Sequence, residues 1–147
     1  IFELPITAGF NRSNFPVWSK VHRLLSSSHL RAFRPIGLAW KTQALRKLYL
    51  SPELTDTSDM KSLVNAALRS GSPVVHMFIH SSTLLPGKNE YTQSESDVSK
   101  LYMRIEHLLK YLTDNNDVTF CTISEASVML ESGFSGYTPP LARPSSK

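Results

Sequence analysis

Two histidines in one apolar segment, His76 and His80, are the residues of this chain best suited to chemistry. An imidazole has an ordinary pKa of about 6.5, so a histidine can exchange a proton with a substrate or hold a metal ion. His80 ends a β-rich run over residues 74–79 and is followed by Ser81 and a hydroxyl-rich loop. The carboxyl ends of buried strands carry the sites of α/β proteins. His80 is therefore the candidate catalytic residue, and a histidine that only makes a structural hydrogen bond is the alternative.

The spacing of His76 and His80 would place both rings on one face of a helix, where they could share a metal ion. The β-branched and aromatic residues around them favour a strand instead. Four residues of a strand span about 13 Å, which is too far for one ion. The chain has no HExxH pattern, and its one cysteine, Cys121, excludes a multi-cysteine zinc site. No metal ligand is predicted in this chain, and Cys121 is expected to be packed inside a strand.

Other catalytic patterns are weak. The chain has no Gly-x-Ser-x-Gly elbow for a serine nucleophile, and its six glycines form neither a GxGxxG nor a GxxxxGK[ST] phosphate loop. Serines in loops usually bond to nearby backbone groups. The composition, 41% hydrophobic and 19% charged, is that of an ordinary globular domain. No apolar run approaches the roughly 18 residues that span a bilayer, so no membrane span is expected.

The first third of the chain is basic. Residues 4–52 contain no Asp or Glu and are interspersed with aromatic side chains. Such a region could meet nucleic acid, an anionic sugar or a nucleotide diphosphate. The charges stand singly, which favours a solvated face, and most of the aromatic residues are expected in the core. A nucleic-acid partner is therefore not expected. The basic residues are Arg12, Lys20, Arg23, Arg31, Arg34, Lys41, Arg46 and Lys47.

Hydrophobic periodicity predicts strands that alternate with helices. Strands are expected over residues 1–8, 74–80 and 117–121. Alternation of this kind indicates an α/β fold with about three parallel strands. Helices are expected over residues 16–28, 41–49 and 56–70, from residue 95 through 112, and from Thr122 to Ser132. One domain is expected over residues 1–132, followed by an extended or disordered tail over 133–147 that contains Pro139, Pro140 and Pro144.

The sequence VVHMFIHS at residues 74–81 resembles the last conserved motif of polysaccharide deacetylases, carbohydrate esterase family 4. Further likeness, to a bacterial branch linked to surface-polysaccharide synthesis, lies in LPITAGF (4–10), LSPE (50–53), HSSTLLPG (80–87) and FCTISE (120–125). This resemblance implies that the chain is part of a distorted (β/α)7 barrel and that the intact protein holds a divalent metal ion, usually zinc. It also implies that His80 protonates the leaving amine, with Phe78 and Ser81 near the carbohydrate substrate.

The early Thr-Phe-Asp-Asp and His-x-x-x-His metal motifs of that family are missing here, so the resemblance covers its C-terminal half. The chain starts without an initiator Met or a charged leader, and a missing N-terminal half is the expected partner. The implied function is a metal-dependent N-acetyl-sugar deacetylase, inactive as this chain alone, in the bacterial cytoplasm or cell envelope. The alternative is a non-catalytic carbohydrate or nucleotide-sugar binding module.

Overall fold

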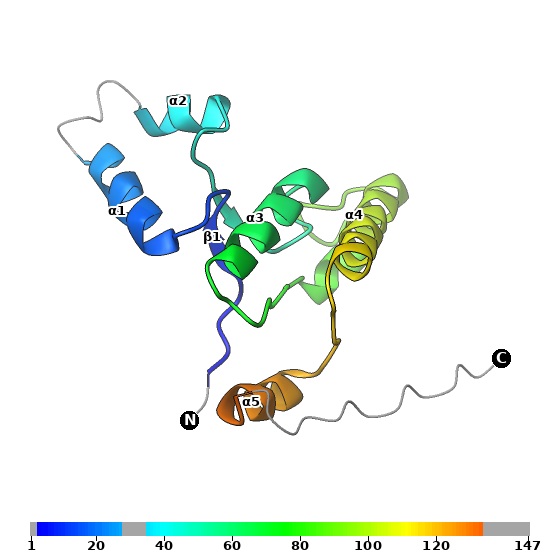
Figure 1. Ribbon diagram of the computed structural model, residues 1–147. Coiled ribbons are helices and arrows are strands. Elements are labelled where there is room, and N and C mark those ends of the chain that lie inside the picture. The colour runs from blue at the N-terminus through cyan, green and yellow to red at the C-terminus, as the bar shows by residue number, and fades with distance from the viewer. Residues whose placement is uncertain (1–2, 28–34, 134–147) are drawn as a thin grey trace.

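The computed structural model describes residues 3–27 and 35–133. Figure 1 shows α3 at the centre of the molecule, with α1 and α2 on one side, α4 on the other, and α5 set apart beyond a long extended connection. The elements in chain order are β1 (Ala8–Phe10), α1 (Phe15–Leu25), α2 (Pro35–Lys41), β2 (Lys47–Tyr49), α3 (Thr57–Arg69), a 3-10 turn (Ser81–Leu84), α4 (Glu95–Asn115) and α5 (Ile123–Glu131).

The expected barrel portion with parallel strands is wrong. The strands among the described residues are β1 and β2, which pair antiparallel with Gly9 opposite Leu48. Residues 74–80 and 117–121 do not form strands. A parallel ladder needs neighbouring strands with free backbone groups at matching positions. Here residues 74–80 bond to Thr7 and Leu50, which lie outside both strands, and periodicity alone could not reveal this pairing.

Residues 74–80 are extended, and one edge of this segment is bonded. The amide of His76 donates to Thr7 Oγ1 at 2.8 Å, and the His76 carbonyl accepts from the Thr7 amide at 2.9 Å. The Phe78 amide donates to the carbonyl of Leu50 at 3.2 Å. Among the described residues, the intervening amides of Val75 and Met77 have no backbone partner. The segment therefore resembles a strand that is paired along one edge only.

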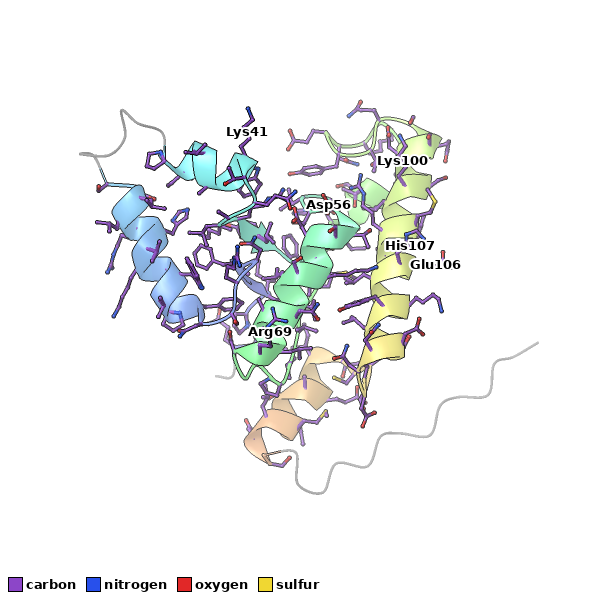
Figure 2. All side chains as sticks on the ribbon, turned by 45° about the horizontal axis from the view of Figure 1, so that its top comes forward. Lys41, Asp56, Arg69, Lys100, Glu106 and His107 are labelled. Carbon is purple, nitrogen blue, oxygen red and sulfur yellow. The ribbon has the colours of Figure 1, made fainter. Side chains whose placement is uncertain are left out.

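The predicted helix over residues 56–70 is confirmed as α3. Asp56 caps it by accepting a hydrogen bond from the Asp59 amide at 2.8 Å, which satisfies one of the free donors of the first turn. Gly71 follows with φ of +83°, a left-handed conformation in which glycine has no Cβ penalty. Figure 2 shows Asp56 and Arg69 at opposite ends of this helix.

Two further helices begin at the predicted capping boxes. Ser94 and Asp97 exchange side-chain and backbone hydrogen bonds at the start of α4, and Thr122 and Glu125 do the same at the start of α5. Each box satisfies two otherwise free amide donors from within four residues. Local sequence is therefore enough to begin both helices. In the part of the chain that the structure describes, no helix is long and apolar enough to cross a membrane.

The predicted helix over residues 41–49 is wrong. Helix α2 ends at Lys41, the chain turns through Gln43 with φ of +56°, and β2 begins at Lys47. Asn11 Oδ1 accepts from the Arg46 amide at 2.9 Å, and this long-range contact favours the strand. The Arg46 guanidinium also lies 2.6 Å from the Asp59 carboxylate and 4.5 Å from the centre of the Trp40 ring, so Arg46 is not a freely solvated charge.

The core lies between α3, α4 and the segment that leaves β2. Leucine and methionine side chains on the inner stripes of the two helices meet there, and this burial is the main stabilising contribution in a small domain. Its fully or nearly buried members are Leu48, Leu50, Met60, Leu63, Val64, Leu108 and Leu112. Leu50 matters most for the site, since it anchors the chain three residues before Glu53.

A second apolar region borders this core. A cavity of about 520 Å³ lies between α3, α4, α5 and the two extended segments, and its lining includes Val75, Met77, Val118 and Met129. Cys121, in the second of these segments, is exposed, contrary to the expected packing inside a strand. The predicted tail lies outside the described residues from residue 134 onward.

Candidate proton-transfer site around His80

Two segments far apart in sequence meet at His80. The hydrogen bond from the Phe78 amide to the Leu50 carbonyl holds residues 50–53 beside residues 78–80. His80 itself is extended, with φ of −87° and ψ of 135°, and precedes the 3-10 turn Ser81–Leu84. The apolar side chain of Leu50 is 1% exposed. Glu53 and His80 are therefore brought together next to the buried side chain of Leu50.

Glu53 is the residue that the sequence reasoning missed. Its side chain is fully buried, whereas the side chain of His80 is 60% exposed. Glu53 Oε2 lies 2.7 Å from His80 Nδ1, and Oε1 accepts from the His80 amide at 2.5 Å and from Thr83 Oγ1 at 2.7 Å. A buried carboxylate needs such partners, because an unpaired charge away from water is costly. Three hydrogen-bond donors therefore hold the Glu53 carboxylate in one position.

Burial by itself would raise the pKa of Glu53, but the hydrogen bonds from the His80 amide and ring and from Thr83, with the nearby His80 charge, bring the pKa below its ordinary value of 4.5. The carboxylate is therefore ionised at neutral pH and can only accept hydrogen bonds. It follows that Nδ1 of His80 carries a proton. The other ring nitrogen, Nε2, is the one available to a substrate.

Two aromatic rings flank the imidazole. Phe78 meets it edge-on, with ring centres 6.0 Å apart and planes at 86°. Tyr91 lies nearly parallel to it, at 6.5 Å and 9°. Phe78 is half-buried and Ser81 is exposed, so the structure brings Phe78 against His80 and leaves Ser81 at the rim. Their role in substrate binding stays a prediction.

A small polar hollow of about 40 Å³ adjoins the pair and is lined by Glu53, Tyr91, Lys100 and Arg104, among others. Arg104 donates to the carbonyl of Pro52 at 2.7 Å, which ties α4 to the residue before Glu53. Lys100 pairs with Asp97 at 3.1 Å and lies towards the N-terminal end of α4 (Figure 2). Lys100 and Arg104, the basic side chains of the hollow, thus already have partners. The contact of Arg104 with Pro52 helps to hold the adjoining Glu53 in place.

The geometry fits proton transfer. A carboxylate on one imidazole nitrogen orients the ring and stabilises its protonated form, while the second nitrogen exchanges protons with a substrate. Within the described ranges, no three His, Cys, Asp or Glu side chains are grouped so that they could hold a metal ion. His76 lies half-buried with Nδ1 3.3 Å from the carbonyl of Leu4, so it is engaged in the structure and not at the site.

One feature of the sequence could have identified Glu53 as a candidate site residue. It is the first acidic residue after a stretch of 49 basic and neutral positions, and it follows the turn-forming Pro52. Nothing local connects it with His80, 27 residues later, because the contact depends on the path of the backbone between them. Comparison of the chain with protein-family models, curated proteins and solved structures finds no match. The resemblance to polysaccharide deacetylases therefore stays a prediction.

Proposed function

We propose that this chain supplies the general acid of a carbohydrate N-deacetylase, with His80 as the proton donor and Glu53 as the residue that orients it. The observation that supports the proposal most is the buried carboxylate of Glu53 on Nδ1 of an exposed imidazole, 2.7 Å away. Exposure of the ring gives a substrate access to Nε2. Burial of the carboxylate keeps water from competing for Nδ1.

The reaction is hydrolysis of an N-acetyl group. Water adds to the acetyl carbon and gives up a proton, the bond between that carbon and the sugar nitrogen breaks, and acetate leaves. His80, protonated on both ring nitrogens, gives its Nε2 proton to the departing nitrogen, so the product is a free amine, and the proton given up by the water restores the imidazolium. An imidazolium suits this step, since a departing amine without a proton is a poor leaving group.

The family resemblance implies a divalent metal, with zinc expected, in the intact protein. The described residues do not fit such a group, because they place no three suitable side chains together. No step of the proposal passes through a metal here. The proposal includes a partner, the N-terminal half implied by the same resemblance, and this 147-residue chain alone is expected to release no acetate.

The alternative is a carbohydrate or nucleotide-sugar binding module built on the basic, aromatic first third. Arg46 and Trp40 from that region contact each other, and Arg46 also pairs with Asp59. A ligand would have to displace these contacts before it could use either side chain. The site at His80 has the better-defined chemistry, so proton transfer is the function that we favour.

The test is acetate release from an N-acetylglucosamine oligomer by the full-length gene product in the presence of Zn²⁺. His80→Ala is expected to lower kcat about 10²–10⁴-fold, the usual contribution of general acid catalysis. His76→Ala is the matched control, and it should reduce stability with little effect on kcat. The proposal is wrong if the wild-type protein releases no acetate, or if His80→Ala keeps wild-type turnover.

A further inference from the structure

The loop that follows the 3-10 turn is organised around Asn89. The Asn89 side-chain amide donates to the Ser82 carbonyl at 2.7 Å and to Thr92 Oγ1 at 2.9 Å. Its oxygen accepts from the amides of Tyr91 at 2.7 Å and Thr92 at 2.9 Å. Both donors and both lone pairs of one amide group are therefore used. A side chain with all four bonds made fixes the loop at several points at once.

One route leads from Asn89 to the carboxylate of the site. Thr92 Oγ1 donates to the carbonyl of Thr83 at 2.9 Å, and Thr83 Oγ1 lies 2.7 Å from Glu53 Oε1. Thr83 and Thr92 are 0% and 2% exposed. Because these bonds are shielded from water, the loss of one leaves a buried group without a partner, which is unfavourable. The position of Glu53 thus depends on Asn89 through two threonines.

A second route leads from Asn89 to the ring of His80 through Tyr91. The Tyr91 amide is held by Asn89, and the Tyr91 ring lies nearly parallel to the imidazole at 9°. The ring centres are 6.5 Å apart, so Tyr91 lies beside the imidazole and does not cover it. Glu53 bonds to Nδ1 and Tyr91 flanks the ring, so the two routes reach the same side chain through different residues.

We propose that Asn89 is a positioning residue that fixes the protonated nitrogen and the orientation of His80 through Thr92, Thr83 and Glu53 on one side and through Tyr91 on the other. The imidazole then presents Nε2 in one direction. The catalytic consequence rests on the proposed function of His80, whereas the structural consequence does not. Asn89 touches no substrate in this account and acts through other residues.

The structural consequence is tested on this chain without a substrate. Nitrogen-15 NMR of the His80 ring, assigned by comparison with His80→Gln, reports which nitrogen is protonated in the neutral form. In the wild type the Nδ1–H form should dominate. In Asn89→Ala the Nε2–H form should grow at its expense, because Glu53 and Tyr91 are no longer held against the ring.

The matched control is Asn65→Ala. Asn65 also makes two side-chain hydrogen bonds, with the Tyr111 hydroxyl at 2.8 and 3.1 Å, but between α3 and α4. It should lower the melting temperature and leave the His80 ring nitrogens unchanged. The inference is overturned if Asn89→Ala is folded and keeps the wild-type nitrogen signals, or if Asn65→Ala alters them equally.

Two milder variants keep the test decisive if Asn89→Ala does not fold. Thr83→Val removes the hydroxyl of the first route, and Tyr91→Leu removes the ring of the second. At least one should shift His80 towards the Nε2–H form, and unchanged signals in both would refute the inference. In the full-length protein, Asn89→Ala should lower kcat by up to about 10²-fold with little change in KM. Failure of the deacetylase assay would refute the proposed function and leave the NMR result standing.

Discussion

Glu53 illustrates how much a single side chain depends on its partners. A carboxylate with no exposed surface is normally unfavourable, yet this one has three donors, two of them from His80. The same hydrogen bonds that make burial possible also keep the group ionised, and an ionised Glu53 is what holds a proton on Nδ1 of His80. Stability and site chemistry therefore depend on the same contacts.

The lowered pKa of Glu53 predicts acid sensitivity. A carboxyl whose folded pKa lies below its unfolded value stabilises the protein fully above the unfolded value, and this contribution is lost as the pH falls through the folded value. The loss should begin near pH 4.5, the ordinary value, and continue below it.

Urea unfolding of wild type and Glu53→Gln between pH 3 and pH 7 measures this effect. The variant should be less stable by about 1–3 kcal/mol at pH 7, since a buried charge-assisted bond is lost, and the difference should narrow below pH 4.5. Glu125, whose pKa is lowered by hydrogen bonds from Thr122 at the solvent-exposed start of α5, provides the control, because Glu125→Gln should lower the stability at pH 7 by less than Glu53→Gln does. A constant difference between wild type and Glu53→Gln across the range would contradict the prediction.

At the scale of the elements, the extended segment over residues 74–80 is distinguished by hydrogen bonds along one edge only. Its even-numbered residues His76 and Phe78 bond to Thr7 and Leu50, while the amides of Val75 and Met77 have no backbone partner among the described residues. Bonding along one edge is enough to aim His80 at Glu53. It does not build a sheet, because a sheet needs a continuous ladder of backbone hydrogen bonds and the His76 amide bonds to the Thr7 side chain instead.

Amide hydrogen exchange should alternate along this segment. The amides of His76 and Phe78 should exchange slowly, because exchange requires their hydrogen bonds to open. Those of Val75 and Met77 should exchange faster. Residue-resolved NMR exchange measures all four in one experiment, and equal protection at the four positions would show that the second edge is also paired.

The start of α5 depends on its cap. Thr122→Ala removes the side-chain acceptor for the Glu125 amide and should destabilise the protein by about 0.5–2 kcal/mol. Thr119→Ala, at an exposed position outside the helix, is the control and should change the stability little. Urea denaturation followed by far-UV circular dichroism compares them. If the two variants were equally stable, the cap would not be what begins this helix.

At the scale of the whole molecule, burial is uneven. Met60 and Leu63, between α3 and α4, are fully buried away from the cavity of about 520 Å³, whereas Met129 of α5 lines that cavity. In Figure 1, α3 and α4 lie side by side, and α5 is joined to α4 by an extended connection. Large-to-small substitutions cost most where the lost contacts cannot be replaced, so the two regions should respond differently.

Leu63→Ala should therefore destabilise the protein by about 2–5 kcal/mol, since Leu63 is 0% exposed in the main core. Met129→Ala should cost clearly less, because the Met129 side chain already borders open space. Leu24→Ala, at a residue 65% exposed on α1, should have almost no effect. Chemical denaturation of the three variants gives the order, and a larger loss for Met129→Ala than for Leu63→Ala would contradict this account of the packing.

The sequence by itself determined the parts of the structure that depend on near neighbours. Helix α3 with its stop at Gly71, and the helices that begin at Ser94 and Thr122, were predicted because their caps lie within a few residues of the groups that they satisfy. The placement of a histidine after an apolar extended run was likewise visible in the sequence.

Only the tertiary structure decided the rest. The antiparallel pairing of β1 with β2, and the strand at Lys47 where a helix was expected, depend on Asn11 reaching Arg46 across 35 residues. The contact of Glu53 with His80 spans 27 residues and that of Thr83 with Glu53 spans 30. Such contacts are set by where the backbone passes and by which buried polar groups need partners, and neither is encoded in the periodicity of a local segment.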